Sequence, residues 1–196
     1  MQCDGCLVPG GFGVRGWEGK ISAAKFCREH GVPYFGICLG MQVLVVEYAR
    51  NVLKLSLADS TEMNKETPDP VICIMKGQDS LLETGGSMRL GVYPCVLNTE
   101  SKVFQAYHGT SLIYERHRHR YELNFDYVSA LEDHGLKVVG TCPQKNLCEI
   151  VEIEDHPWMV GVQFHPEFIS KLTSPHPLFV GFIQAAIAYS RDRSYV

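Results

Sequence analysis

The 196-residue sequence lacks any long apolar run and any excess of basic residues. No stretch approaches the roughly 20 apolar residues that a membrane-spanning helix needs, and the first residues lack the basic-then-apolar order of a secretory leader. The formal net charge of −4 argues against a general nucleic-acid or membrane surface. We therefore expect a cytoplasmic protein with neither a nucleic-acid partner nor a membrane partner.

The sequence is rich in cysteine, but the cysteines are not spaced as the ligands of a metal site are. Cys3 and Cys6 have the two-residue gap of a zinc-ligand pair, but no second pair follows at a matching interval. The eight cysteines are scattered, mostly through apolar segments, as is typical of reduced thiols in a cytosolic protein. We predict no metal site and assign Cys3 and Cys6 to packing.

The sequence does contain an alternation of strands and helices, in a length that suits one domain. Apolar segments predict strands, and helical patterns follow the first two; residues 58–70 are predicted to form a loop. This order favours the α/β class, with a mostly parallel sheet, helices on both faces and a small antiparallel extension. The predicted strands are residues 5–8, 32–37, 71–75, 92–97, 136–141, 149–153 and 159–164, and the predicted helices are residues 18–30, 39–52 and 178–190.

Cys38 lies in the segment GICLG, between a predicted strand and a predicted helix. A sharp turn of this kind, with glycine two residues to either side, lifts the central side chain clear of the sheet as a nucleophile elbow. The start of the following helix favours negative charge, so we expect the Cys38 thiolate to form more easily than in a free cysteine. Alone, Cys38 is equally compatible with a small buried apolar residue.

His165 and Glu167 lie in the later segment GVQFHPE. Because Pro166 favours extended backbone at the residue before it, residues 165 and 167 can project to the same side. A carboxylate beside an imidazole fixes its tautomer and stabilises its protonated form. Alone, His165 could equally be a core histidine; together with the Cys38 elbow it favours a catalytic triad of Cys38, His165 and Glu167.

A third segment, PGGFG at residues 9–13, follows a short apolar strand. A loop with few side chains lets backbone N–H groups point at a developing negative charge, which needs two donors. Our candidates are the N–H groups of Gly11 and Leu39. Taken alone, this segment is better explained as a simple glycine turn.

The segments PGGFG, GICLGMQ and GVQFHPEF together resemble the class I, triad-type glutamine amidotransferase family. Residues 86–91 (GSMRLG) and 115–124 (ERHRHRYELN) resemble segments of the CTP synthase family within it. The resemblance runs from Leu7 to about Tyr189. It implies a flavodoxin-like three-layer sandwich over residues 1–196, and hydrolysis of L-glutamine to glutamate and ammonia through a thioester on Cys38.

The resemblance also implies a glutamine pocket. Arg120 matches an arginine that helps to bind the α-carboxylate region, Glu62 matches a partner for the α-ammonium group, and Gln42 matches a contact to polar groups of the substrate backbone. Phe12 and Tyr121 complete the implied substrate-binding set.

Further expectations concern the longer enzyme. The family carries a covalently linked synthetase domain, in which the ammonia is used for ATP-dependent amination of UTP to CTP. It also carries a strand–helix unit before PGGFG, and we expect residues 1–196 to lack both. The resemblance implies Mg²⁺ and ATP in the synthetase domain, GTP as activator, no cofactor in this domain, and a homo-oligomer, a tetramer at full length.

Alternatives remain at this point. The chain could be another triad amidotransferase, a γ-glutamyl hydrolase, or a regulatory or assembly module without activity. The run from Arg116 to Arg120 places its arginines on one face and its histidines on the other; the residues alone favour a solvated charge run, and the resemblance favours a role in binding glutamine and responding to GTP. We predict that the turn-like contexts expose four other histidines, His108, His134, His156 and His176.

Overall fold

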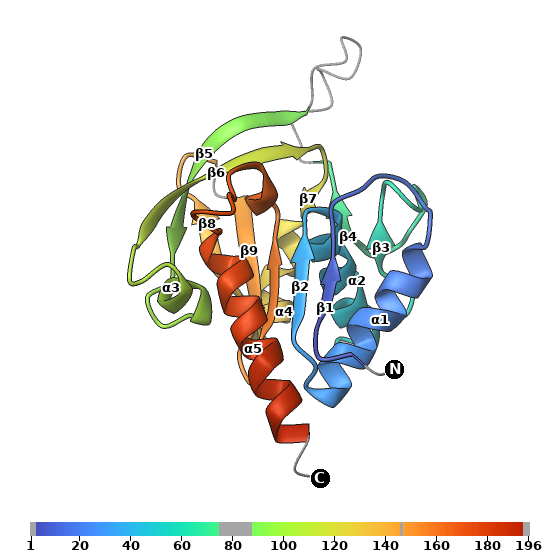
Figure 1. Ribbon diagram of the computed structural model, residues 1–196. Coiled ribbons are helices and arrows are strands. Elements are labelled where there is room, and N and C mark those ends of the chain that lie inside the picture. The colour runs from blue at the N-terminus through green and yellow to red at the C-terminus, as the bar shows by residue number, and fades with distance from the viewer. Residues whose placement is uncertain (1–2, 75–87, 146, 194–196) are drawn as a thin grey trace.

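The computed structural model describes residues 3–74, 88–145 and 147–193 and contains a large sheet covered by helices on both faces (Figure 1). The sheet has seven strands in the order β1-β2-β10-β9-β8-β5-β6. Its strands are β1 (Cys6–Val8), β2 (Tyr34–Ile37), β5 (Arg89–Leu97), β6 (Leu112–His119), β8 (Leu136–Cys142), β9 (Leu147–Ile153) and β10 (Met159–Val162). A small second sheet pairs β3 (Asp59–Ser60), β4 (Pro70–Cys73) and β7 (Glu122–Leu123) in that order.

Alternate side chains of the central strands enter two different hydrophobic cores, because neighbouring residues of a strand point to opposite faces. Tyr34 and Met159 belong to the core beneath α1 (Trp17–His30), α2 (Leu39–Asn51) and α4 (Val128–Asp133). Phe35 and Val160 belong to the core beneath α3 (Lys102–Ala106) and α5 (Pro177–Arg193). The predicted three-layer α/β class is confirmed.

The antiparallel part of the sheet is larger than predicted. Only β1, β2 and β10 run parallel to one another, whereas β9, β8, β5 and β6 are added by antiparallel pairing. Parallel neighbours need a long crossover, usually a helix, and the chain makes one between β1 and β2 through α1. The last two predicted strands form the antiparallel pair β9–β10.

Several elements escaped the sequence prediction: β3, β6, β7, α3 and α4, together with the 3₁₀ turns η2 (Phe125–Tyr127) and η3 (Pro166–Phe168). The predicted stop of the first helix is confirmed, since Gly31 caps α1 at φ 66°, a left-handed conformation that suits glycine. Residue 75 of the third predicted strand and residues 86 and 87 of the GSMRLG segment lie outside the described residues.

Candidate active site

Cys38 occupies the turn between β2 and α2 and has a strained backbone. Its φ of 50° and ψ of −100° are rare for a residue with a side chain. The Cys38 N–H donates to the carbonyl of Val162 in β10 at 2.7 Å, and its carbonyl accepts from the N–H of Met41 at 3.1 Å. The turn is therefore held from the sheet and from the helix, as expected of a nucleophile elbow.

The two glycines that flank Cys38 are required by close backbone packing. A Cβ atom on Gly36 would collide with the backbone of Gly40, and a Cβ atom on Gly40 would collide with the carbonyl of Val8. The first turn of α2 thus packs directly on β1 and β2. This close approach explains the GxCxG spacing in physical terms, since any side chain would push the helix away from the sheet.

Burial dominates the environment of the Cys38 sulfur and raises the pKa of the thiol to about 12. A hydrogen bond from the Leu39 N–H lowers the pKa, while the charges of Glu167, Glu62 and Glu122 raise it. The expectation of an easily formed thiolate is therefore wrong for this arrangement of the site. The helix start does act in the expected direction, but desolvation of a residue that is 3 % exposed outweighs it.

His165 packs against Gly10, as Cys38 does, and is held by Glu167. Its Nδ1 lies 2.6 Å from Oε1 of Glu167, and its ring stacks on Phe168 with centroids 4.5 Å apart. A Cβ atom on Gly10 would lie 2.7 Å from Cε1 of His165 and 3.6 Å from Cβ of Cys38. Both side chains therefore pack against Gly10.

The other ring nitrogen of His165, Nε2, is buried and has no hydrogen-bond partner among the described residues. Because Nδ1 faces a carboxylate, the neutral form of the ring has its proton on Nδ1 and its lone pair on Nε2. The His165 N–H donates to the carbonyl of Arg116 in β6 at 2.8 Å. The backbone and Glu167 together hold the ring with a free basic nitrogen in the site.

The glycine loop of residues 9–13 lies beside the elbow. A Cβ atom on Gly11 would lie 3.3 Å from Cδ2 of Leu39, so the two predicted oxyanion donors belong to neighbouring residues in space. Gly13, at φ 72°, donates its N–H to Oε1 of Glu62 at 2.8 Å. Glu62 thus ties the end of this loop to the segment between β3 and β4.

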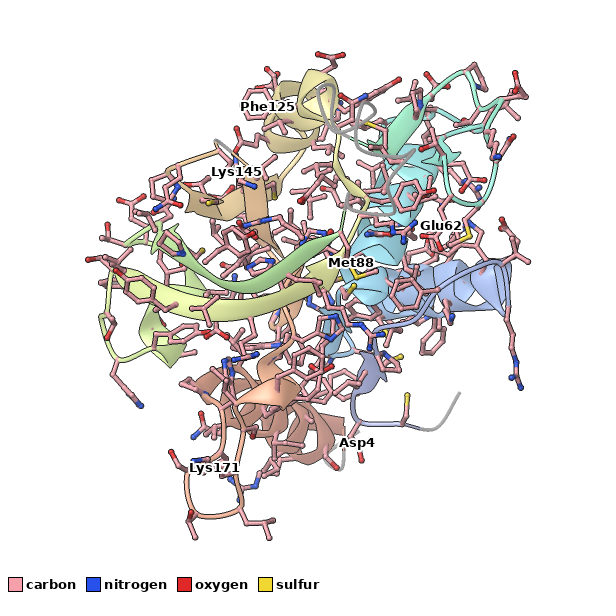
Figure 2. All side chains as sticks on the ribbon, turned by 90° about the horizontal axis from the view of Figure 1, so that it is seen from above. Asp4, Glu62, Met88, Phe125, Lys145 and Lys171 are labelled. Atoms are coloured by element: carbon pink, nitrogen blue, oxygen red, sulfur yellow. The ribbon has the colours of Figure 1, made fainter. Side chains whose placement is uncertain are left out.

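Four of the five predicted substrate-binding residues line one cavity of about 330 Å³. Its lining residues are Phe12, Glu62, Met88, Arg118, Arg120 and Tyr121, and Figure 2 labels Glu62 and Met88 among the side chains seen from above. Met88 and Arg118 were not singled out from the sequence. The cavity presents one carboxylate and two guanidinium groups, which suits a ligand with both an ammonium and a carboxylate group.

Gln42, the fifth predicted residue, does not line this cavity. It is 3 % exposed, and its Nε2 donates to the carbonyl of Tyr121 at 3.2 Å and to Oε1 of Gln163 at 3.3 Å. Its Oε1 is buried without a partner among the described residues. Gln42 is therefore part of the buried core next to the site.

A buried charge cluster underlies the site and was not predicted. Arg89 is 3 % exposed. Its Nη2 lies 2.5 Å from Oε1 of Glu149, and its Nη1 lies 3.3 Å from Oε1 of Glu122. Burial lowers the pKa of His117 to about 2 and that of His119 to about 3, so both histidines are neutral. Burial also raises the pKa of Glu122 to about 8. The alternation of Arg116–Arg120 is confirmed, with arginines exposed and histidines buried.

The prediction that four other histidines are exposed is wrong for two of them. His156 and His176 are 5 % and 3 % exposed. His176 Nδ1 accepts from the Leu178 N–H, so Nε2 carries the proton toward Glu115, 3.0 Å away. Backbone groups satisfy both ring nitrogens of His156, whereas a backbone N–H and the Glu115 carboxylate satisfy those of His176. A turn-like sequence context does not reveal these partners.

Within residues 3–74, 88–145 and 147–193, no three or more His, Cys, Asp or Glu side chains are placed to hold a metal ion. None of the eight cysteines, all of which lie in the described ranges, forms a disulfide. No helix among the described residues is both long and apolar enough to cross a bilayer.

Comparison with known proteins shows the family of the chain. Residues 1–185 match the family model of class-I glutamine amidotransferases. CTP synthase of Chlamydia felis is 75 % identical over 195 residues, and CTP synthase of Chlamydia trachomatis serovar L2 is 65 % identical over 193 residues. These matches cover 100 % and 98 % of this chain but 36 % and 35 % of the two relatives.

Two solved structures share the fold of this chain. The glutaminase domain of Trypanosoma brucei CTPS with bound acivicin superposes with a TM-score of 0.90 at 40 % identity, covering 95 % of this chain and 72 % of that one. A putative GMP synthase protein from Thermoplasma acidophilum, at 16 % identity and a TM-score of 0.64, covers 97 % of this chain and 76 % of its own, and shares the fold. The chain therefore belongs to the class-I glutamine amidotransferase family, and the two Chlamydia relatives named above are CTP synthases.

Proposed function

We propose that this chain hydrolyses L-glutamine to glutamate and ammonia through a thioester on Cys38. The observation that carries the proposal is the arrangement of Cys38 and His165 against Gly10, with Glu167 on Nδ1 and a free Nε2. A related glutaminase domain of 40 % identity is described with bound acivicin, which supports a glutamine site in this fold.

The first half of the reaction follows from these groups. His165 Nε2 takes the Cys38 thiol proton, and the sulfur lone pair attacks the side-chain amide carbon of glutamine. The carbonyl electrons move to oxygen, which the N–H groups of Gly11 and Leu39 stabilise. As the oxyanion collapses, the C–N bond breaks and the nitrogen leaves as ammonia with the proton from His165.

The second half regenerates the thiol. His165 Nε2 takes a proton from water, whose oxygen attacks the thioester carbon. The C–S bond then breaks, glutamate leaves, and the proton returns from His165 to the Cys38 sulfur. Glu167 stabilises the imidazolium in both halves and need not exchange a proton itself.

The roles in the substrate pocket follow from its charges. Arg120 pairs with the α-carboxylate of glutamine, and Glu62 pairs with the α-ammonium group. Phe12 and Tyr121, which also line the cavity, contact the aliphatic stem of the substrate. The implied contact of Gln42 to polar groups of the substrate stays a prediction, since Gln42 does not line this cavity.

For the longer protein we propose the CTP synthase reaction. The chain spans 36 % of the length of its Chlamydia felis relative, which leaves room for a linked synthetase domain. There the ammonia aminates UTP to CTP at the expense of ATP, with Mg²⁺ as the metal and GTP as activator. The assembly is a tetramer, and the free thiols fit a cytoplasmic location.

A glutamine-like electrophile tests the proposal on this chain. A diazoketone analogue of glutamine should add one covalent label to Cys38, detected by peptide mass mapping, and excess L-glutamine should protect the residue. The Cys38→Ser variant should take no label at this site. Labelling of another cysteine with glutamine protection would remove Cys38 from the nucleophile's position, and no labelling at all would favour a module without activity.

A further inference from the structure

A buried amide lies beside the proposed nucleophile, Cys38. Gln163, in the segment GVQFHPE, is fully buried, and its Nε2 lies 3.7 Å from Sγ of Cys38. Its Oε1 accepts a hydrogen bond from Nε2 of Gln42 at 3.3 Å. Its backbone N–H donates to the carbonyl of Glu149 at 2.8 Å, which fixes the base of the side chain.

The neighbours of this amide decide which end faces the sulfur. The carbonyl of Tyr121 can only accept, so the group of Gln42 that faces it must be the NH₂ group. The same nitrogen faces Gln163, which therefore presents its oxygen to Gln42. The remaining NH₂ group of Gln163 points at the Cys38 sulfur, because an amide has one oxygen and one nitrogen.

We propose that Gln163 is a further catalytic residue, whose side-chain N–H donates a hydrogen bond to the Cys38 sulfur and stabilises the thiolate. The thiolate forms when the thiol proton moves to Nε2 of His165. This inference rests on the proposed role of Cys38 as nucleophile.

The need for such a donor follows from the charges around the sulfur. Cys38 is 3 % exposed, so few water molecules can solvate a negative sulfur. Glu167 and Glu62 add repulsion, and the Leu39 N–H is a second protein donor to the sulfur. Once the substrate oxyanion forms, the Leu39 N–H must also donate to that oxyanion. The Gln163 amide, in contrast, still donates to the Cys38 sulfur. A hydrogen bond to a charged acceptor is about twice as strong as one between neutral groups.

Alkylation of Cys38 by iodoacetamide tests the hydrogen bond, because the rate follows the thiolate population. The experiment uses the intact protein at a series of pH values, and peptide mapping separates Cys38 from the other cysteines. Replacing Gln163→Met keeps the length and removes the donor. We expect roughly tenfold slower alkylation at a given pH and a midpoint shifted upward by about one pH unit. The matched control is Gln105→Met, on the exposed face of α3, which should react like the parent.

Gln163→Glu provides a second variant of nearly the same shape, in case the methionine variant does not fold. Its carboxylate repels the thiolate, so alkylation should slow as well. A parent-like rate and midpoint in the folded variants would overturn the proposal, and so would a slower rate with an unchanged midpoint, which indicates packing. Alkylation does not require glutamine turnover, so a parent-like rate in the Gln163 variants would count against the role of Gln163 alone. Failure of the proposed function would be seen in a different experiment, as glutaminase activity that survives in Cys38→Ala.

Discussion

At the scale of single residues, the site depends on close contacts that leave no room for side chains. Gly10 touches both His165 and Cys38, and Gly36 touches Gly40 across the elbow. The roles of the Cys38 elbow and of residues 165–167 could be predicted from the sequence, because each depends on the geometry of residues close together in the chain. Gln163 and Arg89 could not be assigned a role in this way, since their partners lie 125 and 60 residues away along the chain.

Gly10→Ala tests the contact between the glycine loop and the histidine. The new methyl group would lie 2.7 Å from Cε1 of His165 and must displace the ring. We expect kcat for glutamine hydrolysis to fall by roughly a hundredfold, the scale of a misplaced catalytic group, while the chain stays folded by circular dichroism. Gly19→Ala, on the open surface of α1, is the control and should keep kcat and raise stability by about 0.5–1 kcal/mol. A parent-like kcat in Gly10→Ala would show that His165 tolerates the shift.

Arg120→Ala tests the substrate pocket. Removing the guanidinium group deprives the glutamine α-carboxylate of a charge-assisted hydrogen bond, a loss of about 1.5–3 kcal/mol. The KM for glutamine should rise by roughly tenfold to a hundredfold in steady-state assays. Arg191→Ala, at the exposed end of α5, serves as the matched control. An unchanged KM in Arg120→Ala would assign this arginine to structure or to the GTP response.

At the scale of elements, the β5–β6 ribbon combines an exposed row of arginines with a buried row of histidines. The sequence predicted that alternation, since side chains of a strand point to opposite sides. It did not predict that β6 is an edge strand of the main sheet, because its charged residues do not have the composition of a core strand. The burial of His117 and His119 is a tertiary effect, set by β5 and by the charge cluster around Arg89.

The buried histidines make stability depend on pH. Their pKa values fall from 6.5 to about 2 and about 3 in the folded state. Below pH 6.5 the unfolded chain therefore binds protons that the folded chain does not bind. The contribution of the two histidines to the free energy of unfolding is fully present above pH 6.5 and is lost as the pH falls toward 3. Each histidine contributes a slope of up to about 1.4 kcal/mol per pH unit.

His117→Gln should remove one such contribution. Denaturant unfolding between pH 7 and pH 4 should show a shallower loss of stability than in the parent chain. His134→Gln, at an exposed position after α4, is the control and should leave the slope unchanged. An equal slope in His117→Gln and the parent would mean that His117 titrates alike in the folded and unfolded chains.

At the scale of the whole molecule, the fold joins a parallel unit that carries Cys38, the proposed nucleophile, to an antiparallel unit that carries arginines of the cavity. The elbow follows β2 at the centre of the parallel part, and His165 follows β10 beside it. The α/β class was predictable from the alternation of strands and helices. The size of the antiparallel part was not, because its strands pair through contacts distant in sequence, as between β5 and β8.

We propose that Cys38 releases ammonia from glutamine for use at a separate site of the longer protein. The most direct test is Cys38→Ala in that intact protein, assayed for CTP formation from UTP and ATP with two nitrogen sources. With glutamine, product formation should vanish, because no thioester can form without the thiol. With added ammonium salt, product formation should remain nearly unchanged, since the thiolate has no part in the amination. Loss of both activities in the folded variant would contradict two separate sites, and retention of both would show that Cys38 is not the nucleophile.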